Sequence, residues 1–216
     1  ITAIKETIVS KIRETALSNV KNFGQFEQIS VLNICIAKPN KKLILFGAST
    51  GGPDTLLKIL QRVPKDCPPI VIVQHMPPFF TGVFAQRLLS RVAPSVKEVF
   101  HHDALVPGHI YIAPGDSHLT ISKDMSGVLR ANLSKEEMMY VPSIDMLFES
   151  AAKLTRDFKV VGVILTGMGE DGSKGIVSLH QAGGHTLAQD EKSSTLFAMP
   201  KFAIATGHVD QVCGAE

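Results

Sequence analysis

The chain has 216 residues, of which 44% are hydrophobic and 19% charged, and its formal net charge is +2 at pH 7. This composition is typical of a globular protein, and the absence of a basic run argues against nucleic-acid binding. No stretch reaches the roughly 18 apolar residues that a membrane-spanning helix needs. The three cysteines are widely spaced, which predicts no disulfide framework and favours a reducing cytoplasm.

The first 40 residues are predicted to form an amphipathic linker helix followed by a connector. Apolar side chains recur one helical turn apart, at Ile4, Ile8, Ile12 and Ala16. The next stretch, KNFGQFEQIS, has no hydrophobic period and is typical of a connector. Residues 41–216 are therefore predicted to form the main domain.

From residue 41 onward, short apolar strands alternate with helical patterns. The strands are predicted at 43–46, 70–74, 159–166, 185–189 and 209–213. The helices are predicted at 53–63, 81–92, 144–154 and 175–182. This alternation predicts an α/β fold with a mostly parallel, doubly wound sheet and helices on both of its faces.

The middle of the chain shows a different pattern. Three short runs, HIYIAP, HLTISKD and GVLRANL, alternate apolar and polar residues and are separated by turn signals. Pro114-Gly115-Asp116 and Ser126-Gly127 are such signals. We expect an antiparallel β-hairpin or meander inserted into the α/β domain.

The helix predicted at 81–92 carries a candidate capping residue and an apolar face. Thr81 can cap its N-terminus. Apolar residues recur along one side, at Val83, Phe84, Leu88 and Leu89. We expect this side to pack against the sheet.

Three predicted strands are each followed by a residue that suits hydrolytic chemistry. Ser49 follows the strand at 43–46, His75 the strand at 70–74, and Asp171 the strand at 159–166. Sites in open α/β sheets form at the carboxyl ends of strands, so these side chains are expected to meet. A serine hydroxyl needs a base, imidazole can supply it, and a carboxylate can orient the ring. The pattern predicts a Ser-His-Asp triad.

The segment from Gly47 to Gly51 matches the G-x-S-x-G pattern of a strand-to-helix nucleophile turn. Ser49 would lie near the N-terminus of the next helix, where free N–H groups favour developing negative charge. The chain order is Ser, His, Asp, whereas α/β-hydrolases have Ser, acid, His. The order therefore excludes a standard α/β-hydrolase.

Each of these residues also has a simpler interpretation. A glycine-rich turn before a helix can bind phosphate, although this one matches neither G-x-G-x-x-G nor the P-loop. His75 could be a hydrogen-bonded core histidine, and Asp171, set among glycines, a turn residue. A hydrolase of small esters or amides and a nucleotide-binding module are therefore alternative functions. The joint placement at three strand ends favours the triad.

Six further motifs of the chain resemble those of a known family. In order, they are GASTGGP, QHMPPFFTGVFAQRL, PGHIYIAPGDSHL, PSIDMLFESAA, VGVILTGMGEDGSKG and TLAQDEKSSTLFAMPKFAI. Together they resemble the catalytic domain of bacterial chemotaxis protein-glutamate methylesterases, the CheB type, over nearly all of residues 41–213. The resemblance implies hydrolysis of glutamate methyl esters on cytoplasmic chemoreceptor helices. It also implies deamidation of receptor glutamines to glutamate.

The resemblance assigns roles to particular residues. It implies Ser49 as nucleophile, His75 as base and Asp171 as the carboxylate. It places oxyanion donors at the backbone N–H groups of His75 and Met168. The supporting turns would be formed by Gly47, Thr50, Gly51, Gly167 and Gly169. No cofactor and no metal site are predicted, because the other histidines lack metal-ligand spacing.

The resemblance also implies partners and a location. The substrates would be methyl-accepting chemotaxis receptors in the cytoplasm. A receiver domain, phosphorylated by the chemotaxis kinase, would precede the catalytic domain in the full-length protein. The chain has no room for that domain, so it is expected to be a fragment that holds the linker and the effector. Neither nucleic-acid binding nor membrane insertion is expected.

Overall fold

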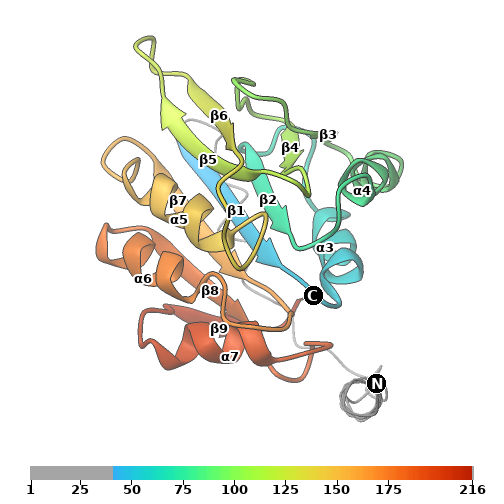
Figure 1. Ribbon diagram of the computed structural model, residues 1–216, viewed down its shortest axis with the longest axis vertical. Helices are drawn as coiled ribbons and strands as arrows, with labels where there is room; N and C mark the ends of the chain where they lie inside the picture. The colour runs from blue at the N-terminus through green and yellow to red at the C-terminus, as the bar shows by residue number, and fades with distance from the viewer. Residues whose placement is uncertain (1–40, 216) are drawn as a thin grey trace.

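The computed structural model describes residues 41–215 (Figure 1). The predicted linker helix and connector of residues 1–40 lie outside the described residues. The elements in chain order are β1 Lys42–Ala48, α3 Gly52–Leu60, β2 Ile70–Gln74, α4 Phe80–Leu89, β3 Ser95–Glu98, β4 His109–Ile112, β5 His118–Lys123, β6 Leu129–Ser134, α5 Ile144–Ala152, β7 Lys159–Ile164, α6 Ser173–Gln181, β8 His185–Gln189, α7 Ala198–Ala205 and β9 Gln211–Cys213. Within residues 41–215, no helix is long and apolar enough to cross a membrane.

Seven strands form one sheet in the order β3-β4-β2-β1-β7-β8-β9, and every neighbouring pair is parallel. The chain builds outward from β1 through β2 to β3 and β4, and then returns to the other side of β1 with β7. The strand order therefore reverses beside β1. Ligands of doubly wound sheets bind outside the carboxyl ends of the strands at such a switch point.

The sheet separates two apolar cores. Leu43 and Leu45 of β1 face the core that α5, α6, α7 and the β5–β6 hairpin cover. Ile44 and Phe46 face the opposite core, which α3 and α4 cover. Successive strand residues point to opposite faces, so a central strand with helices on both sides is apolar throughout. The predicted α/β class, with helices on both faces, is confirmed (Figure 1).

The inserted antiparallel element is a hairpin of β5 and β6, which forms a sheet of its own. The prediction of a third run in this element is wrong. His109–Ile112 is β4, a parallel strand between β2 and β3 of the main sheet. Its residues Ile110, Tyr111 and Ile112 are all buried, as expected for a strand covered on both faces. The alternation of apolar and polar residues in this run is typical of a strand buried on one face, so the sequence did not indicate burial on both faces.

Thr81 does not cap α4, contrary to the sequence-based expectation. The helix begins at Phe80, and Phe79 occupies the capping position with a left-handed φ of 76°. Thr81 lies inside the first turn, where its hydroxyl donates to the Glu98 carboxylate and accepts from the Gly115 N–H. The threonine therefore joins α4 to the edge of the sheet and to a neighbouring loop.

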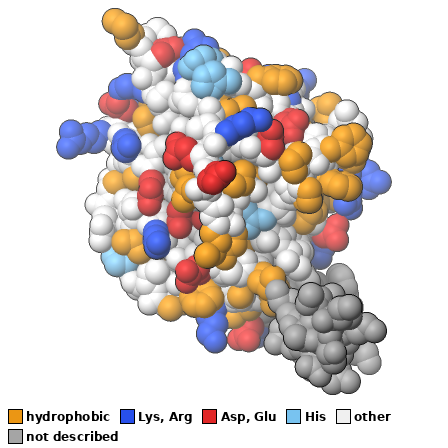
Figure 2. Space-filling view, in the orientation of Figure 1, with side chains coloured by type: hydrophobic (Ala, Val, Ile, Leu, Met, Phe, Trp, Pro, Cys, Tyr) orange, Lys and Arg blue, Asp and Glu red, His pale blue; other side chains and the backbone are white. Residues whose placement is uncertain are grey.

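The apolar face predicted for α4 is only half correct. Phe84 and Leu88 are buried, whereas Val83 and Leu89 are exposed. Apolar side chains gather over this helix on the right of the space-filling view (Figure 2). The helix lies at the side of the sheet formed by β3 and β4, so only part of its surface is covered.

Candidate active site

The three predicted catalytic residues lie at one edge of the sheet. Ala48 of β1 pairs with Gln74 of β2, so Ser49 and His75 follow directly on neighbouring strands. The Ser49 N–H donates to the Thr166 carbonyl, 3.0 Å away and just beyond β7. Neighbouring strands lie about 4.8 Å apart, which brings the loops after β1, β2 and β7 together.

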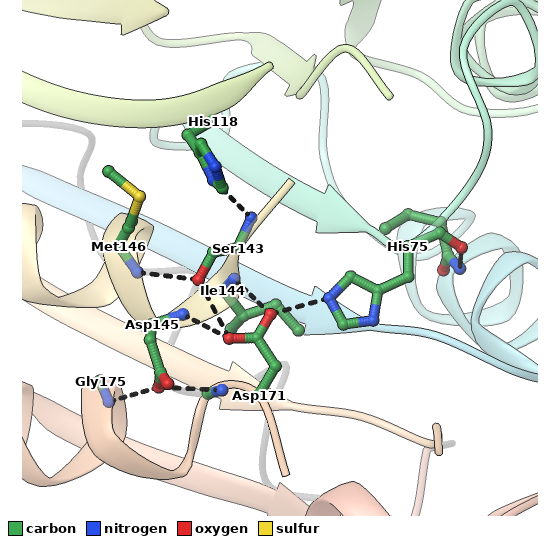
Figure 3. Close-up of polar contacts among 10 residues, drawn as sticks. His75, His118, Ser143, Ile144, Asp145, Met146, Asp171 and Gly175 are labelled. Atoms are coloured by element: carbon green, nitrogen blue, oxygen red, sulfur yellow. Dashed lines mark hydrogen bonds and ion pairs between the residues drawn. The ribbon is translucent and has the colours of Figure 1, made fainter. Parts of the chain in front are cut away.

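The imidazole of His75 is paired with the carboxylate of Asp171. Nε2 of the ring lies 2.8 Å from Oδ2 of the carboxylate (Figure 3). In a neutral ring, Nε2 donates to the carboxylate and leaves Nδ1 as the acceptor. Among the hydrogen bonds of the described residues, none joins the Ser49 hydroxyl to this ring. Nucleophile–base contacts are often long before substrate binds, so the absence of this bond does not remove Ser49 from the candidate site.

Asp171 is buried, and the first turn of α5 supplies most of its partners. The Ser143 hydroxyl and the Asp145 N–H donate to Oδ1, each over 3.1 Å, and the Ile144 N–H donates to Oδ2 over 2.7 Å (Figure 3). Burial raises the pKa of this carboxyl, but the hydrogen bonds from His75, Ile144 and Asp145 outweigh it. The pKa of Asp171 is therefore lowered, and the group is held as a carboxylate.

Asp145 supports the same carboxylate from α5. One oxygen of its side chain accepts from the Gly172 N–H over 2.9 Å and from the Gly175 N–H over 2.7 Å. These bonds tie the start of α5 to the start of α6, directly after Asp171. Burial raises the pKa of Asp145, and the charge of Asp171 adds to the increase. The pKa values of these two neighbouring carboxyls are thus shifted in opposite directions.

One of the two expected oxyanion donors has a backbone partner in the structure. The His75 N–H donates to the Ala48 carbonyl, 2.9 Å away, because it continues the β1–β2 ladder. This N–H is therefore already engaged. The backbone N–H groups of Met168 and Thr50 donate to no described residue, and both lie in the loops beside Ser49. These two N–H groups are therefore the candidate donors to a substrate oxygen.

At three of the predicted supporting glycines, the structure leaves no room for a side chain or has a backbone conformation that favours glycine. A Cβ at Gly167 would lie 2.6 Å from Ser49 Cβ, so only glycine allows the β7 loop to pass this close. Gly51 and Gly169 have φ values of +82° and +94°, a region that side chains disfavour. Both turns around the site thus depend on glycine.

The family model described as CheB methylesterase matches residues 44–216. This chain belongs to the CheB methylesterase family. The solved CheB methylesterase catalytic domain of Thermotoga maritima is 40% identical, with a TM-score of 0.78. That similarity covers 81% of this chain and 93% of the Thermotoga maritima chain.

Curated relatives of this CheB-family chain carry the name protein-glutamate methylesterase/protein-glutamine glutaminase. One from Cupriavidus pinatubonensis is 43% identical over 96% of this chain and 59% of its own length. One from Dechloromonas aromatica is 39% identical over 98% of this chain and 62% of its own length. One from Burkholderia pseudomallei is 47% identical over 80% of this chain and 47% of its own length. The chain thus spans about half to three-fifths of these relatives.

Gln74 of this CheB-family site was not singled out by the sequence. Its side-chain amide donates to the Ser49 carbonyl over 2.8 Å and to the His75 carbonyl over 3.1 Å. The side chain is buried and packs against Gly52, where no Cβ would fit. The available signal is a polar residue that ends the otherwise apolar run IVIVQ. Gln74 fixes the backbone of the predicted nucleophile relative to that of the predicted base.

His118, in β5, is a second residue whose position was not foreseen. Its Nδ1 accepts from the Ser143 N–H over 3.1 Å (Figure 3). Its Nε2 lies 2.9 Å from the Glu136 carbonyl. The ring is buried and joins the hairpin to the first turn of α5. Within residues 41–215, no cluster of three or more His, Cys, Asp or Glu side chains could hold a metal ion.

Proposed function

We propose that this CheB-family chain is a serine hydrolase that removes methyl groups from glutamate methyl esters on the cytoplasmic helices of bacterial chemoreceptors. The main support is the buried Asp171 carboxylate, 2.8 Å from His75, beside the Ser49 turn. The names of the relatives, protein-glutamate methylesterase/protein-glutamine glutaminase, supply the substrate class. The placement of Ser49, His75 and Asp171 after strands of one sheet also supports the proposal, since sites in open α/β sheets form there.

In the proposed mechanism, the Ser49 hydroxyl oxygen attacks the side-chain carbonyl carbon of the ester. Its proton passes to Nδ1 of His75, while Asp171 stabilises the imidazolium. The carbonyl oxygen becomes an oxyanion that the Met168 and Thr50 N–H groups can receive. The carbon–oxygen bond to the methoxy group then breaks, and the imidazolium protonates the departing methanol.

The acyl-enzyme is then cleaved by water. His75 removes a proton from the water, which attacks the acyl carbon and forms a second oxyanion. Collapse releases the glutamate side chain and returns the proton to Ser49. A glutamine side chain would follow the same steps with ammonia as the leaving group. We therefore include deamidation of receptor glutamines in the proposal.

The proposed substrate also implies a setting. The receptors' modified helices are cytoplasmic, so the protein would act in the cytoplasm. The relatives are considerably longer than this chain, and we propose that the full-length protein carries a receiver domain before the catalytic domain. Phosphorylation of that domain by the chemotaxis kinase would control access to Ser49.

The test is methanol release from methylated receptor. Ser49→Ala should lower the rate by a factor on the order of 10⁴ or more, since removal of a triad nucleophile has such an effect. Ser90→Ala is the matched control, because Ser90 is exposed at the end of α4. Undiminished release by Ser49→Ala would overturn the assignment. Hydrolysis of small esters without activity on receptor would instead indicate a general esterase.

A further inference from the structure

Tyr140 lies flat against the ring of His75. The two ring centroids are 5.3 Å apart and the ring planes differ by 4°. Tyr140 belongs to the loop between β6 and α5, whereas the three predicted catalytic residues follow strands of the sheet. Its neighbour Met139 is 88% exposed, so the loop turns toward the site at the tyrosine.

The same side chain also contacts the turn after β7. A Cβ at Gly169 would lie 2.5 Å from the Tyr140 hydroxyl oxygen and 3.1 Å from Cζ. Gly169 follows Met168, whose N–H is a candidate oxyanion donor. One aromatic side chain therefore touches both the proposed base and the proposed oxyanion turn.

This contact restricts the orientation of the His75 ring, which its hydrogen bond alone does not fix. The single bond from His75 Nε2 to Asp171 fixes one ring atom, but the ring can still tilt about that bond. The terminal torsion of a histidine is broad, so packing must select its value. A parallel aromatic ring restricts the tilt, and its negative face also favours the imidazolium formed during the reaction.

We propose that Tyr140 is a positioning residue for His75 and for the turn from Gly167 to Gly169. The inference rests on the proposed function of Ser49, His75 and Asp171. The aromatic face of Tyr140 restricts the tilt of the His75 ring, which orients Nδ1 for taking the Ser49 proton during the reaction. The phenol ring and its hydroxyl together set the distance between the base and the Met168 N–H. Tyr140 itself exchanges no proton with the substrate.

The first test compares Tyr140→Leu, Tyr140→Phe and Met139→Ala in methanol release from methylated receptor. Leucine removes the aromatic face, so kcat should fall about 10-fold to 100-fold with little change in KM, as expected for a misplaced catalytic group. Phenylalanine keeps the stacked ring, so Tyr140→Phe should retain most of the wild-type kcat. Met139→Ala is the matched control from the same loop and should keep wild-type kcat.

Three outcomes would overturn the proposal. They are a Tyr140→Leu variant with wild-type kcat, an equal kcat loss in the leucine and phenylalanine variants, and an effect confined to KM. The last would indicate substrate docking. Far-UV circular dichroism and thermal melting of each variant identify a loss caused by unfolding. Retained activity in Ser49→Ala would refute the proposed function itself, which separates that failure from a failure of the Tyr140 proposal.

A second test uses the contact with Gly169. The new methyl group of Gly169→Ala would collide with the Tyr140 hydroxyl, which Tyr140→Phe removes. The backbone strain at Gly169 is the same in both backgrounds and cancels in a double-mutant cycle. Gly169→Ala should therefore lower kcat several-fold less in Tyr140→Phe than in wild type. An equal loss in both backgrounds would contradict the proposed contact.

Discussion

Asp171 combines deep burial with a lowered pKa, since His75 and the first turn of α5 all donate to it. An unfolded aspartate has a pKa of about 3.9, so the unfolded chain takes up this proton first as the pH falls. The ionised group therefore contributes stability above that unfolded value. The contribution is lost as the pH falls through the lower folded-state pKa.

We expect the difference in unfolding free energy between wild type and Asp171→Asn to shrink as the pH is lowered from about 7 to about 3. Wild type should lose the carboxylate's contribution on acidification, whereas asparagine has no such proton to gain. Urea denaturation of both proteins over this range gives the comparison. A difference that stays constant or grows toward low pH would contradict the lowered pKa.

Gln74 offers a second test on the scale of one side chain. Gln74→Met keeps the volume but removes the donors to the Ser49 and His75 carbonyls. We expect kcat to fall about 10-fold to 100-fold, because the nucleophile and base lose their common support. The unfolding free energy should fall by only about 1–3 kcal/mol. Gln86→Met, on the exposed surface of α4, is the control and should match wild type in both measurements.

At the scale of elements, the packing of β1 against α5 determines where the Asp171 carboxylate lies. Gly47, near the end of β1, has no room for a Cβ, because two Ile144 carbons would lie 3.0 Å away and a third closer. Ile144 also donates to Asp171 from the start of α5. Any shift of this helix therefore moves the carboxylate that holds His75.

Gly47→Ala should lower the unfolding free energy by about 1–3 kcal/mol, as overpacking does, and should also lower kcat. Gly82→Ala is the matched control. Gly82 lies on the partly exposed helix α4, and a Cβ there would lie 3.4 Å from its nearest neighbour, a carboxylate oxygen of Glu98. Alanine in a helix is favoured over glycine by about 0.5–1 kcal/mol, so this variant should be slightly more stable. Chemical denaturation and methanol release measure both effects. Equal stability of the two variants would contradict the packing argument.

Local sequence signals predicted some elements closely and missed others. The buried strands β2 and β8 have the predicted bounds, because apolar runs end there at polar or turn-forming residues. The helix α7 was not predicted, since Pro200 in its first turns weakens the helical signal. The edge strand β3, SVKE, carries little hydrophobic pattern and was also missed.

In the candidate site, too, local sequence patterns predicted some residues, whereas others depend on tertiary contacts. A rule about strand ends was enough to predict that His75 and Asp171 would meet, and their contact of 2.8 Å agrees with it. That the Ser49 hydroxyl joins this pair stays a prediction. The roles of Gln74 and Tyr140 depend on contacts between segments far apart in the chain, which one sequence does not reveal. Ser143 caps α5, but its bond to Asp171 joins residues 28 positions apart, which one sequence does not reveal.

At the scale of the whole molecule, one arrangement of loops at the sheet's switch point serves both proposed reactions. Methyl esters and side-chain amides differ only in the leaving group, so both should depend on the same nucleophile and base. We expect Ser49→Ala to lower methanol release and ammonia release from receptor together. Assays of both products on methylated receptor and on its glutamine form make the comparison. Ammonia release that persists in Ser49→Ala would contradict a shared site.

In the proposed mechanism, Ser49 forms a covalent bond with the glutamyl carbonyl carbon. Acid quenching of the protein during turnover of a peptide that carries a glutamate methyl ester should trap that acyl-enzyme. Trypsin then releases Leu43–Lys58, which contains Ser49. Mass spectrometry should show this fragment carrying the substrate peptide minus methanol, with fragment ions that place the adduct on Ser49. An adduct on any other side chain would contradict the account.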